Sequence, residues 1–375
     1  MIYFDHAATT NIENEVYDFL VQSLKEDFAN PSSSHKLGKA LQEKIQTAKL
    51  DFLKMLSAKA TDHFYFTASA TESNNTIIKG FNWNAGDAVV FSLADHKSIV
   101  EPMLKLKSLG VDLININHHQ DGTLNLDSLV ANDRVKLVVL SHVNNQSGTI
   151  VDLNSSAKLI KELYPKSHLH IDMVQSFTKL DSKINSFIDS VSIAAHKIGG
   201  PKGVGGLYLK AGHTVYPLIH GGGQQADFRS GTETYSLDLS FKLAADLRLK
   251  THLADFKIAE KNINLLKLGI KNIISNSEFP FINTSPYILC FIVPKISSDI
   301  LLRHLEQKNI FLSSTSACSS KVKGFNSTLA ALGINEKFHK NVIRLSISKY
   351  TTEEEVTEFL STLSTVWSDL KYLIK

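Results

Sequence analysis

Two side chains in the middle of the chain have the chemistry and the setting to work together. Lys197 follows a short apolar run, residues 191–194, and precedes a glycine-rich stretch, residues 199–203. A lysine that is partly removed from water keeps its amine available as a nucleophile and can form an imine with a carbonyl group. Asp172 ends another apolar run, where a carboxylate is costly unless it has a buried partner. A protonated ring nitrogen could be that partner, although a structural ion pair for Asp172 and an exposed loop position for Lys197 remain alternatives.

Further polar segments also follow predicted strands. Residues 67–75 are rich in small side chains and enter a predicted helix, so their backbone N–H groups, with the Thr71 hydroxyl, could bind a phosphate. A histidine such as His96, in a loop after a strand, can lie over an aromatic ring and move protons. Asn145 and Gln175 carry amides that could reach such a ring. Taken singly, these segments are also explained as helix caps and turns.

The combination is more specific than its parts. A phosphate cradle, a ring-stacking histidine, an acid at a strand end and a lysine beyond the next strand are what pyridoxal 5'-phosphate needs from a protein. The acid keeps the pyridine nitrogen protonated, and the ring then absorbs electrons. We therefore predict a pyridoxal-phosphate site. The glycine-rich stretch lacks the spacing of a P-loop.

These residues need a scaffold that gathers the ends of several strands. Short β-rich runs alternate with helical patterns, which predicts a mostly parallel sheet covered by helices, and ligands bind beyond the carboxyl ends of such strands. A first long helix is expected from Ser34 onward. Strands are predicted at residues 63–66, 88–92, 112–116, 136–141, 168–172, 191–194 and 204–209.

The pattern changes near Asp255. The later elements are predicted as a helix at 256–274, strands at 288–293 and 342–348, a helix at 298–308 and a last helix at 353–373. We predict an α/β protein with a large domain over residues 13–254 and a smaller α+β domain formed by residues 1–12 and 255–375.

Composition excludes several other classes. Of 375 residues, 43% are hydrophobic and 21% charged, which is typical of a globular enzyme and not of a disordered chain. A net charge of +3 is too small to indicate nucleic-acid binding. No apolar run approaches the ~20 residues of a membrane span, and no signal peptide is visible. Two cysteines cannot form a disulfide framework, so a cytoplasmic protein is expected.

Several motifs in order resemble the cysteine desulfurases of the class V aminotransferase family, which are fold type I pyridoxal-phosphate enzymes. The resemblance runs from residue 3 almost to the C-terminus. Its motifs are residues 3–10 (YFDHAATT), 30–33 (NPSS), 70–75 (ATESNN), 142–145 (HVNN), 196–197 (HK), 220–223 (HGGG), 229–233 (RSGTE) and 316–318 (SAC).

The resemblance implies a role for each matching residue around the ring. Lys197 would bond the cofactor and later carry the substrate's Cα proton. Asp172 would pair with the ring nitrogen, and His96 would stack on the ring. Asn145 and Gln175 would contact the phenolic oxygen of the ring.

The resemblance also implies a phosphate site made by two subunits. Ala70, Thr71 and His196 would hold the phosphate within one chain. Thr232 would reach across from a second subunit, which implies a homodimer.

Substrate binding and sulfur transfer are implied in the same way. Asn30 and Arg344 would bind the carboxylate of L-cysteine, although a surface ion pair is the simpler interpretation of Arg344 without the family. Cys318 lies in a polar stretch, residues 313–320, where a reactive thiol is favoured over a buried one. Cys318 would take sulfur from L-cysteine, release L-alanine and hold a persulfide for a protein acceptor, such as an iron–sulfur scaffold or a sulfur carrier in tRNA or cofactor thiolation. Cys290, inside an apolar run, is interpreted as core packing.

Five positions depart from the family pattern: Ser69, Gln146, Ala194, Ala195 and Thr315. They leave Lys197 and Asp172 in place, but they motivate one alternative, a non-catalytic binding subunit that keeps the fold.

Two other classes of function stay open. One is a class V transaminase or a selenocysteine lyase, and a transaminase would not need Cys318. The other is a metal protein built on the histidine pairs at 118–119 or at 168 and 170, although neither pair lies in a cluster with metal-ligand spacing.

Overall fold

The computed structural model describes residues 1–314 and 325–370. Its centre is a seven-stranded sheet in the order β2-β8-β7-β6-β5-β3-β4, in which β8 runs in the direction opposite to that of the other six strands. The strands are β2 (His63–Thr67), β3 (Ala88–Phe91), β4 (Asp112–Asn115), β5 (Val135–Ser141), β6 (His168–Asp172), β7 (Ser190–Ala194) and β8 (Gly205–Leu209). The predicted α/β fold is confirmed.

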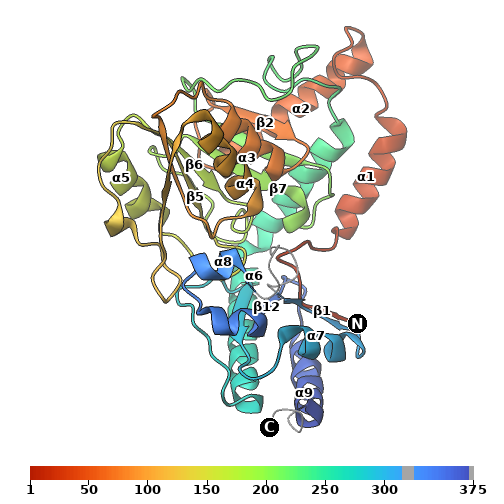
Figure 1. Cartoon of the computed structure of the whole chain (residues 1–375). Coiled ribbons are helices and arrows are strands. Elements are labelled where there is room, and N and C mark those ends of the chain that lie inside the picture. The colour runs from red at the N-terminus through yellow and green to blue at the C-terminus, as the bar shows by residue number, and fades with distance from the viewer. Residues whose placement is uncertain (315–324, 371–375) are drawn as a thin grey trace.

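Side chains alternate between the two faces of this sheet, as strand geometry requires. In β3, Ala88 and Val90 join one hydrophobic core, whereas Val89 and Phe91 join another. The first core contacts α1, α2, α5 and α6, and the second contacts α3 and α4, so helices cover both faces (Figure 1). These helices are α1 (Asn14–Glu26), α2 (Lys36–Met55), α3 (Ala70–Lys79), α4 (Lys97–Leu106), α5 (Leu153–Leu163) and α6 (Tyr235–Ile273).

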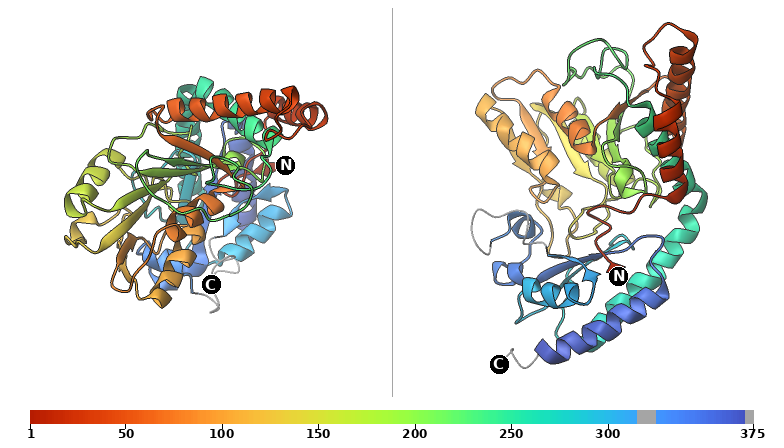
Figure 2. Two further views of the ribbon diagram at one scale, coloured as in Figure 1. Left: turned by 90° about the horizontal axis from the view of Figure 1, so that it is seen from above. Right: turned by 90° about the vertical axis from the view of Figure 1, so that its right-hand side faces the viewer.

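Helix α6 links the sheet domain to the rest of the chain. Phe241 and Ala244 belong to the sheet core, whereas Leu266 and Ile270 belong to a separate core around β9 and α9. The 39 residues of α6 extend roughly 58 Å and run along the side of both parts (Figure 2). The boundary predicted between residues 254 and 255 therefore falls inside one continuous helix.

The second part is a smaller layer of strands and helices. An antiparallel sheet in the order β11-β12-β9 packs against helices, and β1 pairs in parallel with β10. Its elements are β1 (Ile2–Tyr3), β9 (Ile288–Ile292), α7 (Ser298–Glu306), β10 (Ile310–Phe311), β11 (Ser313–Ser314), α8 (Ser327–Ala331), β12 (Val342–Ser346) and α9 (Glu353–Leu370). The N-terminal strand thus pairs with a strand from the other end of the chain, and the residues after it run between the two parts (Figures 1 and 2).

Short 3-10 turns complete the described elements. They cover Lys107–Leu109, Leu126–Ser128, Ala195–Lys197 and Glu336–Asn341. The turn at Ala195–Lys197 follows β7 directly and sets the position of Lys197.

Candidate active site

The carboxyl ends of neighbouring parallel strands bring the predicted site residues to one edge of the sheet. Asp172 is the last residue of β6, and Lys197 follows β7 after one short turn. His96 caps α4 after β3, and Asn145 follows β5. This is the edge at which ligands bind in open α/β sheets.

Lys197 is held by the N-terminal segment. Its Nζ donates to the backbone oxygens of Ala7 at 2.5 Å and Ala8 at 2.7 Å. Burial, and after it the charge of Arg344, lower the pKa of the Lys197 amine to about 8 against the opposing charges of Asp5 and Asp172. A lysine with this pKa has a substantial neutral fraction near pH 8, as imine formation needs.

Asp172 is buried and oriented by two donors. Oδ2 accepts a hydrogen bond from Asn74 Nδ2 at 3.0 Å, and Oδ1 accepts one from the Val174 backbone N–H at 3.0 Å. The two carboxylate oxygens together accept about four hydrogen bonds, so lone pairs remain for a further donor. The charge of Asp172 also raises the pKa of Lys197 and of His96, which places the three groups in one electrostatic neighbourhood.

His96 is held as a neutral ring. Its Nδ1 lies 2.8 Å from Ser98 Oγ and 3.2 Å from the Ser98 backbone N–H, which donates to it. Burial lowers the pKa of His96, an effect that Asp172 opposes and Lys197 adds to. A neutral, fixed imidazole next to Asp172 is suited to stack on a ring.

The phosphate cradle predicted from the sequence falls at the start of α3. Ser69 caps the helix by accepting from the Glu72 backbone N–H at 3.2 Å. Among the described residues, the backbone N–H groups of Ala70 and Thr71 find no acceptor. A Cβ on Gly205 would lie 2.8 Å from the Ala70 nitrogen, so glycine lets the helix start sit against β8. Two free N–H groups at a helix N-terminus are an anion site.

His196 lies beside the N-terminal segment. Its Nδ1 is 3.1 Å from Thr9 Oγ1, and burial lowers the pKa of the ring to about 4, with Lys197 lowering it further. The ring is therefore neutral and could act as a hydrogen-bond donor.

Arg344 is buried in an ion pair and is not on the surface. Nη2 donates to Asp5 Oδ1 at 2.7 Å, and Nη1 donates to the Asn145 backbone oxygen at 3.0 Å. Its Nε is buried without a hydrogen-bond partner among the described residues. The side chain thus lies next to Asn145 and retains one unused donor.

The two predicted amides differ in their contacts. Gln175 donates from Nε2 to the Ala7 backbone oxygen at 2.9 Å, and its Oε1 is buried without a partner among the residues described. Asn145 touches the site through its backbone oxygen and Arg344. Asn144, its neighbour in the motif, instead fixes a turn by accepting from the backbone N–H groups of Gln146 and Ser147.

Three predicted residues lie outside this arrangement. Asn30 and Thr232 are exposed. The connection between α1 and α2, which carries Asn30, lies at the end of the large part that is farthest from the small one (Figures 1 and 2). Asn30 and Lys197 of the same chain therefore lie apart. Cys318, like the departure at Thr315, lies outside the described residues.

The structure adds contacts that sequence reasoning missed. Asn74, quoted only as part of a motif, holds Asp172, and the carbonyls of Ala7 and Ala8 hold Lys197. Asp5 neutralises Arg344. The one signal available in the sequence was that these residues belong to motifs. A contact made by a backbone carbonyl cannot be predicted from the type of side chain.

Cys290 is buried in a hydrophobic cluster that includes Leu329 and Val342. Burial raises the pKa of its thiol to about 12, so the thiolate is scarce at neutral pH. These observations fit its interpretation as a packing residue.

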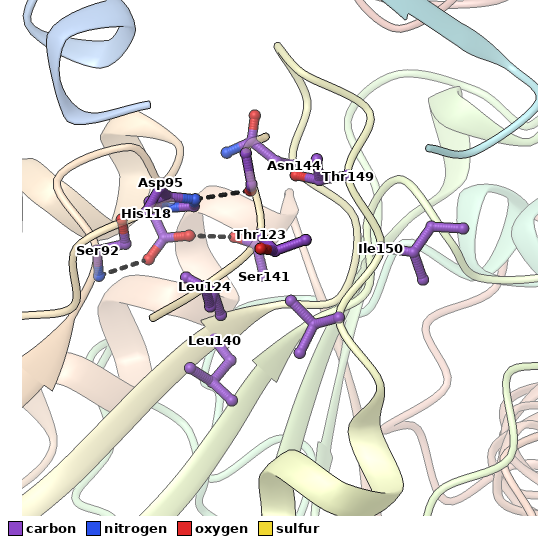
Figure 3. A pocket seen from close by; sticks show the side chains of 12 residues that line it. Ser92, Asp95, His118, Thr123, Leu124, Leu140, Ser141, Asn144, Thr149 and Ile150 are labelled. Carbon is purple, nitrogen blue, oxygen red and sulfur yellow. Dashed lines mark hydrogen bonds between the residues drawn. The ribbon is translucent and has the colours of Figure 1, made fainter. Parts of the chain in front are cut away.

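A separate hollow lies beside the His96 loop, lined by residues that include Leu124, Leu140 and Ile150 (Figure 3). Asp95 accepts there from Ser141 Oγ at 2.6 Å and from the Ser92 backbone N–H at 3.0 Å. Burial raises the pKa of Asp95 to about 7, although these hydrogen bonds lower it. The polar groups of the hollow thus bond to one another, and they hold the loop that carries His96.

Histidines of the two pairs considered for metal binding are engaged in other contacts. His118 Nε2 lies 2.9 Å from Ser92 Oγ, and both His168 and His170 contact Ser190. Within residues 1–314 and 325–370, His168, Asp189 and His213 lie close enough to share an ion. Lys161 Nζ lies 2.5 Å from Asp189 Oδ2, and Lys210 Nζ lies 3.6 Å from Oδ1. The carboxylate is therefore already neutralised by lysines.

No helix in the described part of the chain has the length and apolar character to cross a membrane.

Comparison with known proteins places the whole chain in one family. The family model of class V aminotransferases matches residues 2–359, and the chain belongs to this family. Similar relatives include a NifS/IcsS protein homolog of Lactobacillus delbrueckii subsp. bulgaricus, 34% identical with 98% of this chain and 97% of the relative covered. The cysteine desulfurase IscS of Dictyoglomus turgidum is 31% identical, with 99% and 95% covered.

Solved structures agree with this assignment. A NifS-like protein superposes with a TM-score of 0.90 at 28% identity over 98% of this chain and 100% of its own. A structure of SspA in complex with cysteine has a TM-score of 0.78 at 25% identity, with 94% and 100% covered. Within the class V aminotransferases, the chain is thus a member of the group that contains the cysteine desulfurases.

Proposed function

We propose that this chain is a pyridoxal-phosphate-dependent cysteine desulfurase that converts L-cysteine to L-alanine and keeps the sulfur as a persulfide on Cys318. The observation that carries the proposal is the desolvated amine of Lys197, with a pKa of about 8, at the strand edge that also holds the buried carboxylate of Asp172. The cysteine desulfurases among its relatives support the choice of reaction. A transaminase or a selenocysteine lyase is not favoured by these relatives.

The residues at this edge fit the cofactor. The free N–H groups of Ala70 and Thr71 suit the phosphate, and His196 and the Thr71 hydroxyl could add donors. Asp172 has lone pairs left for the ring nitrogen, and His96 would cover one face of the ring. Asn145 and Gln175 would lie near the phenolic oxygen. The departures at Ser69 and Ala194 leave this set intact, because Ser69 is a helix cap and Ala194 is buried in β7.

When bound, pyridoxal phosphate supplies an electron sink that makes the bonds at the substrate's Cα and Cβ easier to break. The chain's own residues do the rest. Lys197 would hold the cofactor through its amine and would carry the Cα proton of the substrate. Asp172 would hold the proton of the ring nitrogen, and His96 would fix the ring in place.

Arg344 would bind the substrate carboxylate through a charge-assisted hydrogen bond. Its guanidinium is paired with Asp5, and its Nε is unused. β11 pairs with β12 so that Ser313 lies opposite Arg344, and the segment that contains Cys318 follows β11 directly. Ser313, five residues before Cys318 in the sequence, thus lies beside the proposed carboxylate site.

The Cys318 thiolate would attack the sulfur of the substrate. A sulfur–sulfur bond forms while the Cβ–Sγ bond breaks, and its electron pair stays on carbon. The carbon takes up one proton to complete alanine, and the transferred sulfur keeps its hydrogen as the outer atom of the persulfide. A protein acceptor, such as an iron–sulfur scaffold or a sulfur carrier, would then remove that sulfur.

We also propose a homodimer. Thr232 and Asn30 are both exposed, and Asn30 belongs to the connection between α1 and α2 at the end of the large part farthest from the small one, so both could serve the site of a second chain. A thiol that must be reduced to react fits a cytoplasmic enzyme.

The decisive experiment incubates the protein with L-cysteine and measures alanine and protein-bound persulfide. We expect Cys318→Ser to abolish both, while the matched control Cys290→Ala, at a buried thiol, still forms persulfide. Full alanine release by Cys318→Ser would overturn the sulfur-transfer step.

The cofactor is tested separately by colour. The protein should be yellow after addition of pyridoxal phosphate, and Lys197→Ala should lose the absorbance of the bonded cofactor. A protein that stays colourless would instead support a non-catalytic binding subunit.

A further inference from the structure

One face of β6 and β7 is polar in a place where the rest of the sheet is apolar. His170, Ser190 and Ser192 are completely buried, and His168 is 3% exposed. These side chains alternate along the strands with Leu169, Ile171, Val191 and Ile193, which belong to the hydrophobic core on the other face. Buried polar groups are costly unless they are paired, so their contacts need an account.

The contacts form a continuous chain that ends at Asp172. Asn74 Nδ2 lies 3.0 Å from Asp172 Oδ2, and His170 Nε2 lies 2.9 Å from Asn74 Oδ1. Ser190 Oγ lies 2.7 Å from His170 Nδ1 and 2.6 Å from His168 Nε2. His168 Nδ1 lies 3.2 Å from His213 Nδ1, and His213 Nε2 lies 3.1 Å from Asp189 Oδ1. We call this set the relay; its members are Asp189, His213, His168, Ser190, His170, Asn74 and Asp172.

The direction of the inner bonds follows from bonding capacity. Asn74 must present its NH₂ group to Asp172, because the carboxylate repels an amide oxygen. Asn74 Oδ1 then accepts from Ser192 Oγ at 2.6 Å and from His170, so His170 carries its hydrogen on Nε2. Burial lowers the pKa of His170 to about 3, so the ring is neutral and its Nδ1 accepts from Ser190.

The direction of the outer hydrogen bonds follows from the same comparison of donors and acceptors. Ser190 has one hydrogen, which it gives to His170, so it accepts from His168 Nε2. Burial lowers the pKa of His168 well below its usual value, which leaves His168 Nδ1 as an acceptor for His213. His213 Nδ1 therefore donates to His168 Nδ1, and His213 Nε2 faces Asp189 Oδ1. From His213 inward, every donor points toward Asp172.

We infer that the relay fixes the orientation of the Asp172 carboxylate, and that Asn74 and His170 are positioning residues for the ring nitrogen of the cofactor. This inference rests on the proposed function, which pairs Asp172 with that nitrogen. Hydrogen bonds aligned in one direction polarise one another, so each link strengthens the donation to Asp172. Without His170, the Asn74 amide would lose one of the two donors that hold its oxygen away from the carboxylate.

The first test needs no cofactor. Full-length protein labelled with ¹⁵N-histidine should show His168 and His170 as neutral rings protonated on Nε2, and His213 with a hydrogen on Nδ1. His170→Gln and His168→Gln assign the signals. A His170 ring protonated on Nδ1 would reverse the direction of the relay and overturn the inference, whatever the protein catalyses.

The second test uses the holoenzyme and compares two substitutions at one position. Gln can place an amide N–H where His170 has Nε2, whereas Leu cannot. We expect His170→Leu to shift the visible absorbance of the cofactor and to lower kcat by about tenfold to a hundredfold, as for other groups that orient a functional ligand. His170→Gln should retain the spectrum and most of kcat. Leu169→Val, on the opposite face, is the matched control and should leave the spectrum unchanged.

Ser192→Ala keeps the test informative if His170→Leu does not fold. It removes the other donor to Asn74 Oδ1 and should shift the spectrum in the same direction by less. Equal spectra for the wild type, His170→Leu and Ser192→Ala, in an enzyme whose spectrum does respond to Asp172→Ala, would refute the relay and leave the proposed function standing. A protein that binds no pyridoxal phosphate would refute the proposed function instead.

Discussion

The two faces of β6 and β7 contrast more sharply than any two domains of this molecule. On one face, Leu169, Ile171, Val191 and Ile193 join the large hydrophobic core. On the other face, the alternating residues are histidines, serines and Asp172, all buried and hydrogen-bonded. Burial of each aliphatic side chain stabilises the fold by about 1.5–3 kcal/mol, whereas a buried hydrogen bond contributes a net of only about 0.5–1.5 kcal/mol. The same strands therefore use one face for stability and the other for chemistry.

The largest expected effect comes from the polar face. Asp172→Ala removes the carboxylate that we propose pairs with the ring nitrogen, and turnover should fall on the order of 10³-fold, the scale of a lost electrostatic contact at a reacting group. The free energy of unfolding should change much less, because the substitution creates little apolar cavity. Steady-state alanine release and urea unfolding measure the two quantities. Near-normal turnover in Asp172→Ala would contradict the proposal that the polar face of β6 and β7 serves the reaction.

The neighbouring residue should behave in the opposite way. Ile171→Ala opens a cavity in the core and should lower the free energy of unfolding by about 2–5 kcal/mol. Its turnover per folded molecule should stay within about twofold of wild type, since the side chain points away from the site. Urea unfolding and activity on the soluble fraction check this. A large loss of turnover in folded Ile171→Ala protein would show that the faces are not separable.

The third prediction concerns the pH at which the Lys197 amine becomes reactive. Its pKa is lowered from 10.5 to about 8, so labelling of the cofactor-free protein by an acylating reagent should rise as pH increases through about 8. Asp5 raises this pKa, so Asp5→Asn should move the midpoint to lower pH. Peptide mass spectrometry reads the labelling, with Lys54, whose side chain is 77% exposed, as internal reference. A midpoint near 10.5 would mean that the amine is not desolvated.

The smallest effect compares two helix caps. Ser69 caps α3 on the polar side of the sheet, and Asp152 caps α5, which packs on the apolar core. Substitution of either by Ala should lower the free energy of unfolding by about 1 kcal/mol. Only Ser69→Ala should also weaken binding of pyridoxal phosphate, measured by titration of the cofactor-free protein. Equal affinities for pyridoxal phosphate in both variants would contradict the proposal that the start of α3 binds the phosphate.

The sequence predicted the scaffold well because strands with alternating or continuous apolar residues leave a clear pattern. Six of the elements at the site, from β2 to β7, lie within a few residues of their predicted positions. The extent of α6 could not be predicted, because its exposed middle joins two cores and has no single apolar stripe; the predicted helix at 256–274 begins twenty-one residues too late.

The site was predictable where side-chain chemistry is specific and unpredictable where the backbone or a distant partner acts. Lys197 and Asp172 stand out by type and place. The bond from Asn74 to Asp172 joins residues 98 positions apart, and no spacing rule reaches so far. His170 was considered as a metal ligand together with His168, because a sequence shows which residues alternate along a strand. It does not show which side chains of other elements contact them.

The carbonyl oxygens of Ala7 and Ala8 hold the amine of Lys197, and Asp5 holds Arg344. Residues 5–8 therefore form one wall of the candidate active site. A variant chain that lacks these residues would lose all three contacts, and the positions of the Lys197 amine and the Arg344 guanidinium would no longer be fixed by them.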